Sequence, residues 1–255
     1  MKRPLFLVTN DDGVAAEGIH ALAEGIAAVG EVVVVAPDRE RSAAGHSLTL
    51  QHPLRATELS ANRYVVDGTP TDCVNWGTHY LLRGRRPDAI LSGINFGLNL
   101  GDDVTYSGTV SAAFEGAILG IPSIAFSQEI APGFTFDAAA AFARDLAVEV
   151  LRNPLRPGTL LNVNVPAGDV RGVRAVKMGR RVYQEGVVEK LDPRGRKYYW
   201  IGASPPTGEP EEGTDLWAIA EKLISVTPLH LDLTDYSALE ALDAAVARFS
   251  AVGRA

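Results

Sequence analysis

The run VVVVA at Val32–Ala36 constrains the fold more than any other stretch of this sequence. Consecutive β-branched residues favour a strand, and the lack of polar alternation is typical of a strand buried on both faces. Such strands occur mainly in parallel sheets that helices cover on both sides. An apolar run, Leu5–Thr9, and a segment of helical composition, Gly18–Val29, precede it, so the chain opens with a strand–helix–strand pattern.

The same alternation continues to Pro166. A helix is predicted to begin at Thr69-Pro70-Thr71-Asp72, which offers a capping Thr, a Pro in the first turn and an acid three residues after the cap, and to run to Gly84. Repeated alternation of this kind predicts an α/β fold with a mostly parallel, doubly wound sheet. The further expected elements are strands at Ala89–Ser92, Ser123–Ser127 and Leu160–Val165, and helices at Val110–Leu119 and Asp137–Leu151.

The pattern changes after Pro166, where strands are predicted without helices between them. Two of them, Arg181–Leu191 and Lys197–Gly202, read as a β-hairpin with Asp192-Pro193-Arg194-Gly195 at its turn. The hairpin could pack on its own subunit or embrace a neighbour, and the second reading is slightly favoured. We divide the single domain 1–255 into a core (1–166), a hairpin extension (167–213) and a C-terminal strand and helix (214–255). The remaining expected elements are strands at Val173–Lys177 and Leu223–Thr227, and helices at Asp215–Lys222 and Tyr236–Phe249.

Composition narrows the functional classes. The formal net charge of −7 disfavours a long nucleic acid as partner, because phosphate contacts need clustered Lys and Arg. The single cysteine, Cys73, excludes a disulfide within the chain and favours a cytoplasmic protein; we expect it to be a packing residue. No stretch approaches the ~20 apolar residues that a membrane span needs.

The motif Asn10-Asp11-Asp12-Gly13 follows the first predicted strand directly. In open α/β sheets, ligands bind beyond the carboxyl ends of the strands, so the two acids should lie at the binding edge. A divalent cation would relieve the repulsion between adjacent carboxylates, and hard oxygen ligands suit Mg²⁺ or Mn²⁺. The alternative is an ordinary turn, since these residue types also favour turns.

Two further segments are expected at the same edge. Pro37–Ser47 follows the second strand, and Ser42 in it offers a hydroxyl oxygen to a hard metal. Leu91–Gly116 follows a strand, is rich in Gly and Asn, and contains Asn95 and Asn99. It ends in Ser107-Gly108-Thr109 at a predicted helix N-terminus, which is a natural anion site. Ser107 could instead only cap the helix, and Asp102 and Asp103 are interpreted as solvated loop charges.

Several motifs are absent from the sequence. It has no G-x-G-x-x-G, no G-x-x-x-x-G-K-[ST] and no G-x-S-x-G, so a dinucleotide fingerprint, a P-loop and an α/β-hydrolase nucleophile are not indicated. The histidines show no zinc-binding spacing. Only His46, in the Ser42 loop, is a candidate for contacting the substrate or its leaving group.

Five stretches that span the chain in order carry a combined resemblance: VTNDDG (8–13), APDRERSAAGHSLT (36–49), DGTPTDCV (67–74), SGINFGLNLGDDVTYSGTVSAAFEG (92–116) and SVTPLHLDLTDY (225–236). Taken together, they resemble the SurE family of metal-dependent nucleoside monophosphate phosphatases. The resemblance implies a Rossmann-like core with a C-terminal hairpin used in oligomerisation, as a homodimer or homotetramer. It also implies one Mg²⁺ or Mn²⁺ per subunit, held by Asp11, Asp12, Ser42 and Asn95.

The resemblance implies hydrolysis of nucleoside monophosphates by metal-assisted attack of water, with a possible side activity on short polyphosphate. Asp11 and Asp12 would carry the catalysis, while the residues around Gly68-Thr69-Pro70 would border the substrate.

Two alternative functions remain. A haloacid-dehalogenase-type phosphatase is the nearest enzymatic rival, but it needs an Asp where this chain has Asn10. A non-catalytic nucleotide or phosphate sensor is the rival from another class. One position departs from the family pattern, which has Gly after the metal-binding Ser where this chain has Ala43. The expected substrate contacts are Asn99, Ser107, Gly108, Thr109 and His46.

Overall fold

The computed structural model describes residues 3–181, 187–201 and 208–249. Its centre is a nine-stranded sheet in the order β3-β4-β2-β1-β5-β6-β7-β11-β8. Most neighbouring strands are parallel, while the β3–β4 and β7–β11 pairs are antiparallel. The strands are β1 (Leu5–Thr9), β2 (Glu31–Pro37), β3 (Ala56–Ser60), β4 (Arg63–Val66), β5 (Ala89–Phe96), β6 (Ser123–Gln128), β7 (Thr159–Val165), β8 (Gly172–Ala175) and β11 (Leu223–His230).

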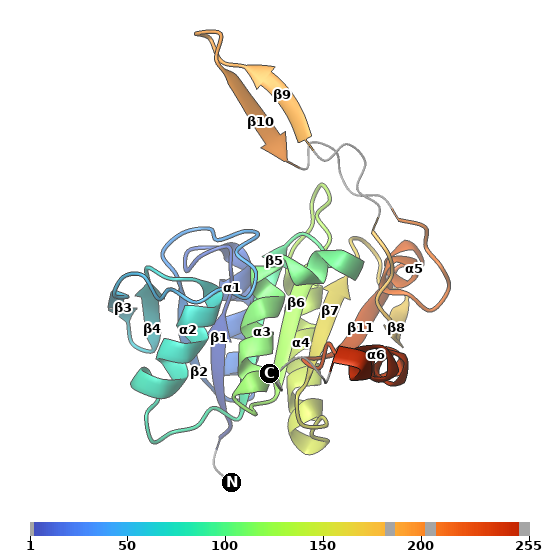
Figure 1. The fold of residues 1–255 in the computed structure, drawn as a ribbon. Coiled ribbons are helices and arrows are strands. Elements are labelled where there is room, and N and C mark those ends of the chain that lie inside the picture. The colour runs from blue at the N-terminus through green and yellow to red at the C-terminus, as the bar shows by residue number, and fades with distance from the viewer. Residues whose placement is uncertain (1–2, 182–186, 202–207, 250–255) are drawn as a thin grey trace, which may run out of the picture.

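Helices cover both faces of this sheet (Figure 1). On one face, α1 (Glu17–Ala27) packs beside α4 (Asp137–Arg152), and on the other α2 (Pro70–Trp76) packs beside α3 (Gly108–Ile118). Alternate residues of β1 enter different cores: Phe6 and Val8 pack with α1 and α4, whereas Leu5 and Leu7 pack with α2. Because both sets are buried, β1 shows the unbroken apolar pattern of a doubly covered strand. The expected mostly parallel α/β fold is confirmed.

Strands β3 and β4 were not predicted from the sequence. In β3, Ala56–Ser60, every residue is exposed, so the strand has no apolar face to mark it. It pairs only with β4, at the edge of the sheet. Edge strands of this kind are held by backbone pairing more than by burial, which explains their weak sequence signal.

Helix ends also differ from expectation. The helix that begins at Pro70 is α-helical only to Trp76 and continues as a π-helical turn, η1 (Gly77–Leu81), so it stops before Gly84. The expected helix Tyr236–Phe249 consists of η3 (Tyr236–Ala238), α6 (Leu239–Val246) and η4 (Ala247–Phe249). A further 3-10 turn, η2 (Gly101–Thr105), precedes α3.

Residues beyond 166 add to the central sheet as well as to the hairpin. Both β8 and β11 belong to the nine-stranded sheet, and α5 (Asp215–Ala220) packs against β11. The hairpin consists of β9 (Val187–Leu191) and β10 (Lys197–Ile201), with antiparallel register. The rest of the two strands expected there, residues 182–186 and 202, lies outside the described residues.

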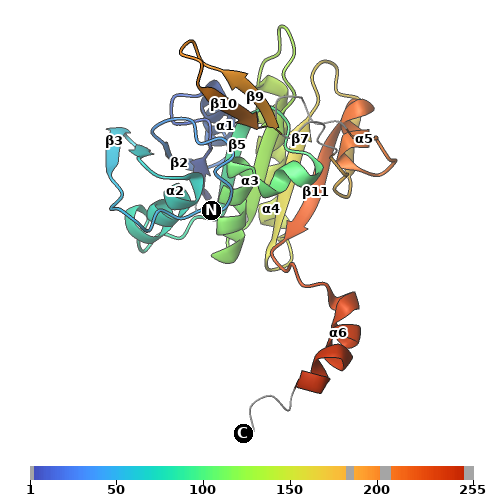
Figure 2. The same ribbon diagram turned by 45° about the horizontal axis from the view of Figure 1, so that its top comes forward.

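Two parts stand away from the body. The β9–β10 hairpin projects beyond the carboxyl edge of the sheet in Figure 1, and α6 extends from the opposite end of β11 in Figure 2. Among the described residues, no helix has both the length and the apolar character needed to cross a bilayer.

Candidate active site

The candidate site lies where the strand order of the sheet reverses. Strand β1 pairs with β2 on one side and with β5 on the other, and the chain moves outward in opposite directions from this pair. Ligands of open α/β sheets bind at such a switch point, beyond the carboxyl ends of the strands. Asp11 and Asp12 follow β1 almost at once, and Asn95 is near the end of β5, so all three belong to this edge.

Asp11 is buried against the start of α3. The Thr109 hydroxyl donates to Asp11 Oδ1, and a Cβ added to Gly108 would lie 2.7 Å from the Asp11 Cβ. Gly108 is therefore required for this close approach. Burial, with a smaller contribution from the neighbouring Asp12, raises the pKa of Asp11 to about 6, although hydrogen bonds from Thr109 act in the opposite direction.

Asp12 is half-buried and anchors the end of β5. Its Oδ2 accepts the backbone N–H of Phe96 at 3.1 Å, which brings Asn95 next to the acidic pair. Desolvation raises the pKa of Asp12, and Glu40 adds to the effect. The Asn95 amide nitrogen donates to the carbonyl of Gly97 at 2.7 Å, which leaves its Oδ1 as the atom that could bind a cation.

The Ser42 loop reaches the same place through a backbone contact. The N–H of Arg41 donates to the backbone carbonyl of Asp11 at 2.7 Å, so Ser42 is the next residue after a direct link to the acidic motif. The Ser42 hydroxyl donates to Glu40 Oε1 at 2.6 Å. Ala43 adopts φ 57°, a left-handed conformation that favours glycine, so the departure from the family pattern falls at a position where glycine would be less strained.

The donor set suits a hard divalent cation. Asp11 and Asp12 make no ion pair with any Lys, Arg or His of the described residues, and the buried Asn10 Oδ1 has no partner there. Two adjacent carboxylates without compensating positive charge are costly to bury. No group of three or more His, Cys, Asp and Glu that could hold a metal occurs in the described part of the chain. A cation at Asp11 and Asp12 would therefore need hydroxyl or amide oxygens, as Ser42 and Asn95 provide.

The start of α3 adds an anion-binding element. Its N-cap is Ser107, whose Oγ accepts the N–H of Val110 at 3.1 Å, so Ser107 does cap the helix. The N–H groups of the first turn and the positive end of the helix dipole lie at the Asp11 carboxylate. The same segment could bind the oxygens of a phosphate bridged to Asp11 by a cation.

His46 contacts an acid of α3, and its expected contact with the substrate stays a prediction. Its Nε2 contacts Glu115 Oε2 at 2.8 Å, and the other Glu115 oxygen accepts from Asn75 Nδ2 at 2.7 Å. The hydrogen bond from His46, followed by that from Asn75, lowers the pKa of Glu115 against the opposing effect of burial. His46 thus fastens the Ser42 loop to α3.

Asn99 is buried and held from several sides. Its side-chain amide donates to Ser127 Oγ at 2.8 Å, and its backbone N–H donates to Asn164 Oδ1 at 2.8 Å. Its carbonyl accepts from the amide groups of Asn162 and Asn164 at 2.9 and 3.0 Å. The substrate contact expected for Asn99 remains a prediction, but the segment that carries it is fixed to β7.

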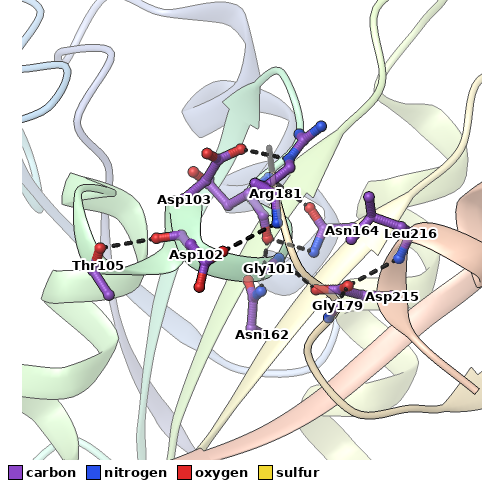
Figure 3. A network of polar contacts seen from close by, with 11 residues as sticks. Gly101, Asp102, Asp103, Thr105, Asn162, Asn164, Gly179, Arg181, Asp215 and Leu216 are labelled. Atoms are coloured by element: carbon purple, nitrogen blue, oxygen red, sulfur yellow. Dashed lines mark hydrogen bonds and ion pairs between the residues drawn. The ribbon is translucent and has the colours of Figure 1, made fainter. Parts of the chain in front are cut away.

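A second anchor holds the next turn of that segment (Figure 3). The buried Asp215 accepts N–H groups from Gly101 at 2.8 Å, Gly179 at 2.7 Å and Leu216 at 2.9 Å. Burial raises the pKa of Asp215, while these three hydrogen bonds lower it. Asp215 therefore ties α5 to η2, the turn that leads into Ser107.

The two acids of η2, interpreted as solvated charges, both contact Arg181: Asp102 is exposed, whereas Asp103 is partly buried in an ion pair. Arg181 donates its backbone N–H to Asp102 at 3.0 Å and its Nε to Asp103 at 2.9 Å (Figure 3). The sequence reading missed Asp215, Asn162 and Asn164 as supports for the site. The polar residues in the apolar strand LLNVNV were the one visible signal, because buried polar side chains in a strand need partners.

The chain is similar to proteins of known sequence and structure over almost its whole length. The family model "Survival protein SurE" matches residues 6–185. The chain is 58% identical to "5'-nucleotidase SurE" of Geobacter sulfurreducens over 240 residues, covering 92% of this chain and 91% of that protein. It is 47% identical to the protein of the same name from Aquifex aeolicus, covering 94% and 97%. The crystal structure of the SurE protein from Aquifex aeolicus superposes with a TM-score of 0.83 at 45% identity, over 95% of this chain and 99% of the other.

Proposed function

The chain belongs to the SurE family, and from this we propose that it is a metal-dependent 5′-nucleotidase that hydrolyses nucleoside monophosphates to nucleoside and phosphate. Relatives that bear the name 5'-nucleotidase SurE match almost the whole length of the chain. The proposal extends their activity to this protein and assigns it to the carboxyl edge of β1 and β5.

One observation carries the assignment. Asp11 lies directly beside the N-terminus of α3, Asp12 follows it and contacts the end of β5, and neither has a positively charged partner among the described residues. Acids would repel a phosphate, whereas the helix N-terminus would attract one. A divalent cation held by Asp11 and Asp12 would reconcile the two, because hard cations take both carboxylate and phosphate oxygens as ligands.

We assign the cation, Mg²⁺ or Mn²⁺, to Asp11, Asp12, Ser42 and Asn95, one ion per subunit. When bound, it would supply Lewis-acid polarisation of a phosphoryl oxygen and lower the pKa of a water. The start of α3 would hold the remaining phosphate oxygens through backbone N–H groups. Thr109 would keep the Asp11 carboxylate in one orientation through its hydroxyl hydrogen bond.

Water is the nucleophile in this proposal. A phosphatase that forms an aspartyl-phosphate would need an Asp two residues before Asp12, but this position is Asn10, and an amide cannot form that intermediate. The Asn10 side chain instead donates to the carbonyl of Gly13 at 2.9 Å. Cys73 is fully buried and its thiol pKa is raised by that burial, so it is unsuited to attack phosphorus.

Two finer points belong to the same proposal. Short polyphosphate would be a side substrate, because the cation and the α3 N-terminus recognise phosphate oxygens and need no base. The protein would assemble as a homodimer or homotetramer through the β9–β10 hairpin, whose exposed Tyr199, Trp200 and Ile201 lack cover within the described chain.

The test is phosphate release from a panel of nucleoside monophosphates with Mg²⁺ or Mn²⁺, with chelated protein as the metal-free arm. We expect release only with metal, and an Asp11→Asn variant should lose at least about a hundredfold in activity, since disturbing even the groups around metal ligands costs up to that much. Asp145→Asn is the matched control, because Asp145 is a surface acid whose one ion-pair partner among the described residues is Arg144.

Two results would count against the proposal. Full turnover by Asp11→Asn, with its fold checked by thermal unfolding, would remove Asp11 from the metal site. If folded, metal-loaded protein released no phosphate from any nucleotide or polyphosphate but still bound nucleotides, the non-catalytic sensor would replace the enzyme.

A further inference from the structure

An exposed aromatic side chain stands at the proposed metal site. Phe96 is the last residue of β5, directly follows Asn95, and is 60% exposed. A phenylalanine this exposed is unusual in a strand whose first six residues are all buried. Because Phe96 lies beside Asp11 and Asp12, a ligand bound to these acids would be close enough to contact its ring.

The backbone around Phe96 is fixed. Its own N–H donates to Asp12 Oδ2 at 3.1 Å, and the next N–H, from Gly97, donates to the carbonyl of Gln128 at 3.0 Å. The preceding Asn95 side chain closes onto Gly97. Phe96 is therefore attached to the metal-binding acid on one side and to β6 on the other, with little freedom to move away.

The ring is supported as well. Phe134, from the segment between β6 and α4, meets it edge-on with centroids 5.6 Å apart and planes at 67°. Phe134 in turn packs at 89° on Phe136, with centroids 5.3 Å apart, and Phe136 is buried. Such an edge-to-face contact holds an aromatic ring in place and covers at most one of its two faces, so a face of the exposed Phe96 ring is left for a ligand.

We propose that Phe96 is the platform on which the base of a nucleoside monophosphate stacks while its phosphate is bound at Asp11 and Asp12. This inference rests on the proposed function and adds the part of the substrate that Phe96 recognises. A 5′ nucleotide separates phosphate from base by one ribose, which is comparable to the length of a Phe residue from its amide to its ring. Stacking on an aromatic face tolerates any base and favours the larger purines.

A second exposed aromatic residue provides the comparison. Tyr106 is 61% exposed, directly precedes Ser107, and accepts the N–H of Gly45 through its backbone carbonyl at 3.1 Å. Among the described residues its ring contacts no other aromatic ring, unlike the rings of Phe96 and Phe134. A ring without such support loses more freedom when a base stacks on it, so Phe96 is the better platform.

The experiment compares two substrates that differ only in the base. AMP and ribose 5-phosphate are hydrolysed with Mn²⁺ by the wild-type protein and by Phe96→Ala. We expect KM for AMP to rise between about fivefold and a hundredfold, the range for losing one stacked base, while kcat/KM for ribose 5-phosphate stays the same. Equal losses on both substrates, or none on AMP, would overturn the platform.

Further variants separate stacking from simple loss of bulk. Phe96→Trp should restore AMP binding, whereas Phe96→Leu should behave as Phe96→Ala because it keeps apolar volume without a π-face. Tyr106→Ala should leave the AMP to ribose 5-phosphate ratio unchanged; if it lowers that ratio while Phe96→Ala does not, Tyr106 is the platform and the proposal is wrong.

Calorimetric titration of AMP separates this inference from the proposed function. If the wild type binds AMP without releasing phosphate, the nucleotidase proposal fails, and the platform stands if Phe96→Ala then binds AMP more weakly by the same factor. If the wild type neither binds nor hydrolyses AMP, both proposals fail. Thermal unfolding of each variant confirms that the exposed position tolerates the change.

Discussion

The carboxyl edge of the sheet and the β9–β10 hairpin differ in how their residues are satisfied. At the edge, polar groups are buried and linked by backbone contacts between segments far apart in sequence, such as Arg41 to Asp11 and Phe96 to Asp12. In the hairpin, apolar side chains such as Trp200 and Ile201 are exposed, and within the described part of the chain β9 pairs only with β10. At the edge, Asp11 and Asp12 find hydrogen-bond partners within the chain, whereas the apolar side chains of the hairpin are left uncovered by the described residues.

The difference is the reason to expect a partner at the hairpin and not at the edge of the sheet. A two-stranded hairpin is marginally stable alone in water, and exposed aromatic and aliphatic residues on it are costly unless another surface covers them. The edge of the sheet, under the proposed function, would take up only a small cation and a small anion. Gly179 and Arg181, which precede the hairpin in the sequence, contact Asp215 and η2, so the segment before the hairpin meets the edge at Asp215.

The largest effect is expected from Asp215→Ala, which removes the contact between Asp215 and the segment before the hairpin. It would leave three backbone N–H groups without an acceptor, those of Gly101, Gly179 and Leu216, and we expect a loss of about 3 kcal/mol in the free energy of unfolding. Urea denaturation measures the loss. Nucleotidase kcat should fall too, because η2 leads into Ser107. A variant as stable and active as the exposed-acid control Asp145→Ala would show that this anchor is dispensable.

The hairpin is tested by Trp200→Asp. If the exposed Trp200 and its neighbours lie in a subunit interface, a buried charge there should cost about 2 kcal/mol and shift the assembly toward smaller species. Sedimentation velocity across a concentration series gives the masses. Lys190→Ser, opposite Tyr198 in the register, is the control on the same hairpin. If the mass distribution were unchanged, the hairpin would not form the subunit interface.

A smaller effect is expected for Glu115→Gln, which weakens the link between the Ser42 loop and α3. Because the folded pKa of Glu115 is lowered, its stabilising contribution is present above the ordinary carboxyl pKa and is lost as pH falls through the folded value. Besides His46 and Asn75, the groups that act on Glu115 include His79. We expect about 1 kcal/mol of destabilisation at neutral pH, measured by urea unfolding. The difference from wild type should disappear in acid; a constant difference would mean that the charge is irrelevant.

The smallest expected effect is a gain in stability from Ala43→Gly. Ala43 has a positive φ, and relief of that strain, reduced by the greater freedom of Gly in the unfolded chain, should add about 0.5–1 kcal/mol. Thermal unfolding would detect the gain, with Ala44→Gly beside it as the control that should only destabilise. A lower melting temperature for Ala43→Gly would contradict the strained conformation.

The sequence predicted the core well because its signals are local. Runs such as VVVVA, the cap at Thr69 and the start of α3 at Ser107 depend on neighbours in the chain, and each was found where expected. The exposed strand β3 was missed, since pairing with β4 stabilises it and leaves no apolar pattern.

By itself, the sequence determined the fold class and the acids that follow β1, because apolar periodicity and residue chemistry can be read along the chain. Only the tertiary structure decided how these acids are held: Thr109 on Asp11, the Phe96 N–H on Asp12, and Asp215 under the turn before Ser107. Those contacts join residues separated by 84 to 114 positions. Burial and hydrogen bonding between such distant residues depend on the packing of the whole sheet, and no local pattern contains them.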